Sequence, residues 1–242
     1  MTVSRLSFGT GTNGWAGRSR QTDIGLKALS DLLVYGYSRG ITFIDSADAY
    51  GSHPHVKEAL KRIPRERVVI ATKTFATKSN SVRAEMDRFR SELGTDILDI
   101  VLMHCVKDGW NIAMKPVMDV LSEAKKRGIA RAIGVSPHSW GALEAAAEDP
   151  WVDVALVRLN YAGVNMDSRM PAKVIPLIEK MRAAGKGVYA MKAFGTGSLK
   201  DAPRALGFCL GVPVDAVTVG METRAHVDEN VRIVLEADGK TG

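Results

Sequence analysis

Short apolar runs rich in β-branched residues alternate along the chain with longer amphipathic segments. The amphipathic segments predict helices at residues 23–39, 53–62, 81–93, 114–127, 140–148, 172–184, 202–210 and 223–235. The apolar runs predict strands that begin near Leu6, Ile41, Arg67, Asp99, Ala130, Asp153, Gly187 and Asp215. Successive runs are on average about 30 residues apart, which is the length of one strand followed by one helix. The pattern therefore predicts eight consecutive strand–helix units.

Two α/β architectures are built from such units, an open doubly wound sheet and a closed (β/α)8 barrel. Six of the apolar runs end on a polar side chain, at Asp45, Lys73, His104, Ser136, Arg158 and Lys192. In a barrel the carboxyl ends of all strands meet at one face, whereas an open sheet spreads them along a line too long for one small substrate. The polar strand ends therefore favour a single-domain (β/α)8 TIM barrel with short loops over residues 1–242, with its site at that face.

The glycines at positions 9, 11 and 14 form the spacing G-x-G-x-x-G, which is typical of dinucleotide-binding turns in open sheets. That turn requires a helix that begins at once and an acidic residue about 20 residues further on. Here the segment 15–22 precedes the first helical pattern, and Asp45 lies 31 residues after Gly14. We therefore interpret the glycines as part of a flexible loop after the first strand.

Charge and composition narrow the class of protein. The 33 basic and 27 acidic residues leave a net charge of +6, spread without a basic block. This distribution suits an anionic small molecule better than a nucleic acid as a partner.

No apolar run approaches the roughly 18 residues of a membrane span, and the first residues do not resemble a signal peptide, so we expect a cytoplasmic protein. Cys105 and Cys209 are too few for a disulfide framework, and His53 and His55 lack metal-ligand spacing, so we expect no metal.

Four residues at or just after the predicted strand ends have complementary chemistry: Asp45, Tyr50, Lys73 and His104. A buried ammonium beside a phenol lowers the pKa of the phenol, and a carboxylate holds the ammonium in place. An imidazole nearby can orient a substrate carbonyl. This group predicts Tyr50 as a general acid near neutral pH, although the ordinary pKa of a tyrosine is about 10.

Four segments carry a family resemblance: GITFIDSADAYG at 40–51, ATKT at 71–74, DIVLMH at 99–104 and RAIGVS at 131–136. Together they resemble the aldo-keto reductase superfamily, and the likeness extends over essentially the whole chain. The resemblance implies an NADPH-dependent oxidoreductase, with NADH as the alternative cofactor, that reduces the small-molecule carbonyl of an aldehyde or ketone to an alcohol. It also implies that Asp45, Tyr50, Lys73 and His104 are the catalytic tetrad, with Tyr50 as the proton donor.

The resemblance further implies a set of cofactor-binding residues: Gly9, Thr10, Gly11, Asp45, Ser136, Arg158, Met191, Lys192, Gly220, Met221, Arg224 and Asn230. Several positions depart from the family pattern. Pro137 replaces a common Asn, Arg158 a carboxamide-binding Gln, and Met191 a Tyr that stacks on the nicotinamide. Gly220 and His226 replace basic residues that grip the adenosine phosphate, although Arg224 could substitute for them.

The chain is short for this family, with a brief loop after Met191 and a short tail after Leu235. A shallow pocket discriminates weakly among substrates, and we expect Trp15 and Trp110 to form its walls beside Tyr50 and His104. Two other functions remain open at this stage. One is a barrel lyase that forms a Schiff base on Lys73, and the other is a nucleotide-binding redox sensor or scaffold with little turnover.

Overall fold

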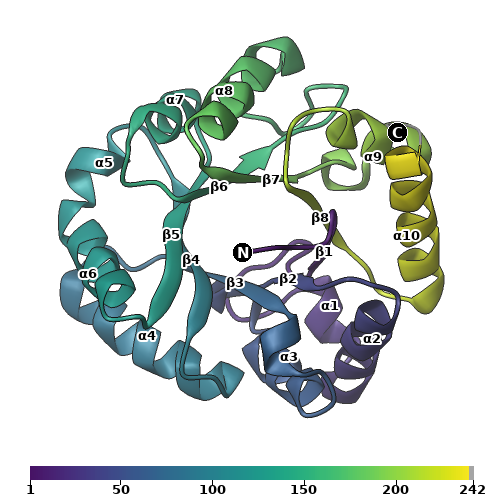
Figure 1. Ribbon diagram of the computed structural model, residues 1–242, viewed down its shortest axis with the longest axis horizontal. Coiled ribbons are helices and arrows are strands. Elements are labelled where there is room, and N and C mark those ends of the chain that lie inside the picture. The colour runs from purple at the N-terminus through teal and green to yellow at the C-terminus, as the bar shows by residue number, and fades with distance from the viewer. Residues whose placement is uncertain (240–242) are drawn as a thin grey trace.

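Eight parallel strands close into a barrel with the order β1-β2-β3-β4-β5-β6-β7-β8. The computed structural model describes residues 1–239. The strands are β1 (Leu6–Gly9), β2 (Phe43–Asp45), β3 (Val69–Thr74), β4 (Leu98–Val106), β5 (Ala130–Pro137), β6 (Val154–Arg158), β7 (Gly187–Met191) and β8 (Ala216–Gly220). Figure 1 looks into the ring of strands, with the helices arranged around its outside. The predicted (β/α)8 TIM barrel is therefore confirmed.

A helix follows each strand, at or near the predicted position: α2 (Leu26–Ser38), α3 (His53–Leu60), α4 (Ser79–Leu93), α6 (Lys115–Lys126), α7 (Trp140–Glu148), α8 (Pro171–Ala183), α9 (Ala202–Leu210) and α10 (Arg224–Gly239). The structure adds five short turns: α1 (Arg20–Asp23), η1 (Asp48–Tyr50), η2 (Arg65–Arg67), α5 (Trp110–Ala113) and η3 (Gly195–Gly197). These turns are too short to produce a helical period in the sequence. Over residues 1–239, every helix is too short or too polar to cross a membrane.

Alternation along the strands divides the apolar residues between two cores. On β4, Val101 and Met103 pack outward against the helices, whereas Ile100 and Leu102 pack inside the barrel. The same alternation on β3 places Ala71 inside and, two residues later, directs Lys73 into the carboxyl end of the barrel. The interior is therefore apolar at its centre and polar at the end where the strands finish.

Candidate active site

The structure brings together the four side chains that the sequence singles out. The Lys73 ammonium donates to Asp45 Oδ1 at 2.7 Å and to the backbone oxygen of Ser46 at 2.7 Å. Its Nζ also lies 3.5 Å from the hydroxyl of Tyr50, which in turn is 3.4 Å from Nε2 of His104. One phenol hydroxyl thus lies between a buried ammonium and an imidazole.

Local structure explains how Tyr50 reaches this position from beyond the end of β2. Asp45 is the last residue of β2, and Tyr50 is the last residue of the turn η1, which returns the chain over the barrel mouth. The turn ends at Gly51, which has a φ of 64° in the left-handed region that favours glycine. A side chain at position 51 would also overlap the backbone oxygen of Gly17. Tyr50 is therefore fixed by a turn that no larger residue could close.

The loop after β1 packs directly on the ring of Tyr50. A Cβ atom at Gly11 would overlap ring carbons of Tyr50, and one at Gly14 would overlap the other edge of the ring. The amide of Gly14 also donates to the oxygen of Gly11 at 2.9 Å, which closes the loop as a tight turn. The structure therefore gives these two glycines a packing role against the phenol, in place of the flexible loop that the sequence suggested.

Replacing Gly11 with Ala is expected to lower catalytic turnover by roughly 100-fold, because the new methyl group must displace the ring of Tyr50 and a displacement of about 1 Å at a reacting group has that effect. Turnover of a carbonyl substrate and thermal unfolding measure the result. Gly207→Ala in α9 is the matched control, since nothing lies within 4 Å of its Cβ position. Wild-type turnover in Gly11→Ala would show that the loop does not hold the phenol.

Burial dominates the electrostatics of the phenol and the ammonium. Burial, and then the charge of Asp45, raise the pKa of Tyr50 well above its ordinary value. Burial also lowers the pKa of Lys73, against the opposing effect of Asp45. The expectation of a depressed pKa for Tyr50 is therefore wrong for this arrangement, because burial disfavours the phenolate and the charge of Asp45 disfavours it further. Tyr50 keeps its proton at neutral pH, as a proton donor must.

The imidazole beside Tyr50 is neutral. Burial, and then repulsion by the charge of Lys73, lower the pKa of His104 to about 2. The ring of Phe75 stacks on the imidazole at 4.3 Å between centroids. In the described part of the chain, no hydrogen-bond partner reaches its buried Nδ1 atom. His104 can therefore hydrogen-bond a substrate oxygen without bringing a second positive charge to the site.

A cavity of about 450 Å³ extends from the tetrad toward α10. Its lining includes these residues from the predicted cofactor set: Gly9, Gly11, Asp45, Met191, Lys192, Gly220 and Asn230. Other lining residues are not among those predicted from the sequence: Thr12, Asn13, Arg20, Ala193, Phe194, Thr196, Gly197, Leu199, Lys200, Ala202, Thr218, Val219, Glu222 and Glu229. Many of these lie in the loops after β1 and β7, where the Gly/Thr-rich segment 195–198 was the available signal. His226, noted only as a replacement for a basic residue, lines it as well.

Five residues of the predicted cofactor set lie outside this lining: Thr10, Ser136, Arg158, Met221 and Arg224. Met221 is buried, and Thr10 donates to the backbone oxygen of Asp45 at 2.9 Å. Arg158 pairs with Asp167. The guanidinium of Arg224 lies over the ring of Tyr35, 4.8 Å from its centroid. In this structure Thr10, Arg158, Met221 and Arg224 are therefore engaged by the protein itself, whereas the buried hydroxyl of Ser136 has no hydrogen-bond partner among the described residues.

The two tryptophans predicted as pocket walls have different environments. Trp15 is 68% exposed and packs edge-on against Phe75 at 5.5 Å, beside the tetrad. Trp110 is 2% exposed, donates its indole N–H to the oxygen of Ala142 at 3.3 Å, and packs 6.0 Å from Trp151. The prediction for Trp110 is wrong, because the short helix α5 turns this side chain into the outer core.

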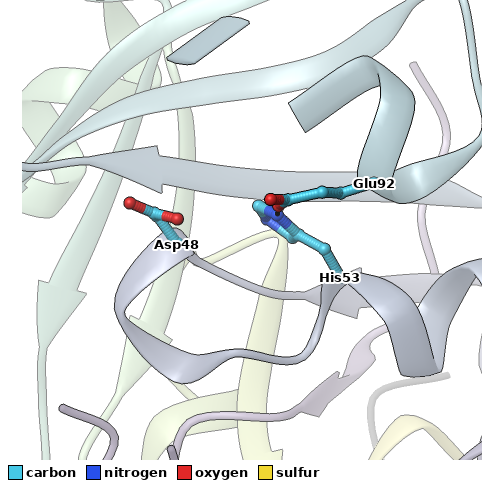
Figure 2. A group of neighbouring side chains, drawn as sticks. All are labelled: Asp48, His53 and Glu92. Carbon is cyan, nitrogen blue, oxygen red and sulfur yellow. Dashed lines mark hydrogen bonds and ion pairs between the residues drawn. The ribbon is translucent and has the colours of Figure 1, made fainter. Parts of the chain in front are cut away.

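Asp48, His53 and Glu92 form a cluster of possible metal ligands near the start of α3, with ligand atoms within 4.8 Å of one another. Figure 2 shows Asp48 extending from the turn before α3 and Glu92 reaching the imidazole of His53 from α4. Both ring nitrogens of His53 already have partners, Glu92 Oε2 at 2.8 Å and Thr72 Oγ1 at 2.8 Å. The carboxylate of Asp48 accepts from Arg88 at 2.7 Å. The cluster is explained by its own hydrogen bonds, which tie α3 and α4 to β3.

The chain is similar to known aldo-keto reductases in sequence and in fold. The chain is 27% identical over 215 residues to "Probable aldo-keto reductase 1" of Glycine max, an alignment that covers 81% of this chain and 57% of that protein. It is 29% identical over 165 residues to the NADH-specific methylglyoxal reductase of Escherichia coli, covering 56% and 49%. The solved aldo-keto reductase AKR2E5 of the silkworm Bombyx mori, complexed with NADPH, superimposes with a TM-score of 0.75 at 20% identity, covering 96% and 82%.

The chain spans about half the length of these two curated relatives. A profile of the Aldo/keto reductase family nevertheless matches residues 5–207, which include all four residues of the tetrad. The match runs from β1 into α9 and so covers most of the barrel. The chain therefore belongs to the aldo/keto reductase family.

Proposed function

We propose that this protein reduces a small aldehyde or ketone to an alcohol with NADPH or NADH, and that Tyr50 donates the proton. The observation that carries the proposal is the position of one protonated phenol hydroxyl, 3.5 Å from the Lys73 ammonium and 3.4 Å from the His104 imidazole. The names of the relatives, which include a methylglyoxal reductase and an NADPH complex, support this reaction class.

The residues around the cavity fit a nicotinamide nucleotide. Thr218 lines the cavity, and its buried hydroxyl has no hydrogen-bond partner in the described structure. The same holds for the buried hydroxyl of Ser136 at the end of β5, where the family resemblance implies a contact with the carboxamide. Lys192 and Lys200 add positive charge to the cavity wall, which suits the phosphates. When bound, the nucleotide supplies the hydride.

The chain supplies the proton and controls the charge that its transfer leaves behind. Tyr50 donates its proton to the carbonyl oxygen, and the neutral imidazole of His104 hydrogen-bonds that oxygen and orients it. The Lys73 ammonium, 3.5 Å away, stabilises the negative charge that develops on the phenol oxygen. Asp45 holds the ammonium in this position at 2.7 Å.

The geometry does not favour Schiff-base chemistry on Lys73. The side chain is fully buried, and the three contacts of its nitrogen, to Asp45, Ser46 and Tyr50, use every donor of an ammonium group. A lysine nucleophile must lose its proton and reach a substrate carbon. Neither is possible while these contacts persist.

Calorimetric titration with NADPH and with NADH, followed by cofactor oxidation in the presence of small aldehydes and ketones, tests the proposal. We expect micromolar binding of at least one nucleotide and oxidation of that nucleotide when methylglyoxal or another small carbonyl compound is added. Binding without oxidation across a broad carbonyl panel would favour the sensor or scaffold instead. Binding of neither nucleotide would overturn the reductase assignment.

A further inference from the structure

A second tyrosine reaches the tetrad from inside the barrel. Tyr189 on β7 is 2% exposed, and its hydroxyl donates to Oδ1 of Asp45 at 2.8 Å. The same carboxylate oxygen accepts from the Lys73 ammonium at 2.7 Å. A neutral hydroxyl and an ammonium therefore share one buried carboxylate oxygen.

Packing fixes this hydroxyl. The ring of Tyr189 lies 5.0 Å from that of Phe43, which is two residues before Asp45 on β2. In the strand register Tyr189 pairs with Leu156 on β6 and with the small residue Ala216 on β8. With its ring against Phe43, the phenol reaches the carboxylate of Asp45 on β2.

We infer that Tyr189 is a positioning residue for the reaction: its hydroxyl fixes the carboxylate of Asp45 and disperses its negative charge, so that the Lys73 ammonium can stabilise the charge that develops on Tyr50. The inference rests on the proposed reductase function. Tyr189 itself lies behind Asp45 and acts only through it.

The physical reason is the opposite action of Asp45 and Lys73 on the phenol. The charge of Asp45 raises the pKa of Tyr50, so a carboxylate with concentrated charge makes proton donation harder. A hydrogen bond from a neutral donor stabilises the carboxylate and weakens that effect. Other groups also act on the proton balance of the site from β3, η1 and β4: Lys73, Tyr50, His104 and Cys105. If Asp45 loses the hydrogen bond from the Tyr189 hydroxyl, none of these groups supplies a replacement for it.

Tyr189→Phe tests the inference, because it removes the hydroxyl and keeps the ring against Phe43. We expect the single-turnover rate of NADPH oxidation and kcat to fall about tenfold, since a hydrogen bond to a charged group is worth about one to two powers of ten. We expect KM for the carbonyl compound and the calorimetric Kd for NADPH to stay within about twofold, because the lost interaction acts in the transition state.

Two control variants separate this effect from simple loss of a hydrogen bond or of packing. Tyr35→Phe removes a matched hydrogen bond from a tyrosine to Asp228, 2.8 Å long, on the outside of the barrel, and should leave kcat unchanged. Phe43→Leu disturbs the ring contact and retains the hydroxyl. It should therefore lower the unfolding temperature, and it should lower kcat less than Tyr189→Phe does.

A Tyr189→Phe rate equal to that of Tyr35→Phe would overturn the inference. So would a rate loss that Phe43→Leu reproduces with the same fall in unfolding temperature, since the role would then be structural. If the wild-type protein binds NADPH but does not oxidise it with any carbonyl compound tested, the proposed function is overturned, and the inference with it.

Discussion

Tyr50→Phe is expected to reduce kcat by about 10²- to 10⁴-fold, which is the usual contribution of a positioned proton donor. The phenylalanine ring can still fill the space beside Gly11 and Gly14, so the loop after β1 should keep its conformation. The variant loses only the hydroxyl between Lys73 and His104. Steady-state turnover with NADPH and a small aldehyde, together with calorimetric Kd, measures both parts of the prediction. We expect Kd to stay nearly unchanged.

The pH dependence adds a check on the role of Tyr50. The donor is active while protonated, so its contribution is present below its pKa and is lost as the pH rises through that value. Because burial raises the pKa of Tyr50 well above its ordinary value, the rate deficit of Tyr50→Phe should be constant from about pH 6 to pH 9. Turnover equal to that of the wild type would remove Tyr50 from the mechanism.

Lys73→Met is expected to lower the free energy of unfolding by about 3–5 kcal/mol, because it leaves the carboxylate of Asp45 buried without its cation. It should also remove most of the turnover. Adding Asp45→Asn should restore a large part of the stability but none of the activity, since a neutral amide tolerates burial better than a lone carboxylate. Denaturant unfolding at neutral pH, on the two variants and the wild type, measures these differences.

An exposed ion pair supplies the control for this experiment. Lys27 donates to Asp31 at 2.6 Å, much as Lys73 does to Asp45, but its side chain is 90% exposed. Lys27→Met should therefore change the stability by less than about 1 kcal/mol. If Lys73→Met proved as stable as Lys27→Met, the buried pair would not be ionised as described.

The barrel and the composition of the tetrad could be predicted because both depend on local sequence patterns. Asp45 ends β2, and Lys73 and His104 lie one and two residues before the ends of β3 and β4, so each is a polar residue that follows a short apolar run. Barrel geometry places such residues at one face. In the structure the Lys73 nitrogen lies 2.7 Å from Asp45 Oδ1 and 3.5 Å from the hydroxyl of Tyr50. That hydroxyl lies 3.4 Å from Nε2 of His104. Their catalytic roles stay a prediction that the variants above test.

Features that depend on packing across the barrel could not be predicted. Tyr189 lies in the apolar segment GVYAM, so the sequence marks it as a core residue and gives no sign that its hydroxyl reaches Asp45, 144 residues earlier. Trp110 follows His104 closely, but one short turn directs it toward Trp151. The direction of the pKa shift of Tyr50 depends on its degree of burial, which sequence spacing does not report.

The contact between the loop after β1 and the ring of Tyr50 sets a rule for protein engineering. Loops at a barrel mouth are the usual segments to exchange when a new substrate range is wanted. In this protein, a grafted loop that lacks glycine at positions 11 and 14 would move the proton donor, however well it fitted the substrate. Trp15, by contrast, is 68% exposed and offers a variable position within the same loop, whereas Asn13 has a φ of 54°, a left-handed conformation that few residues besides glycine and asparagine adopt. Libraries that randomise position 15 and keep both glycines should therefore retain far more active variants than libraries that randomise the whole loop.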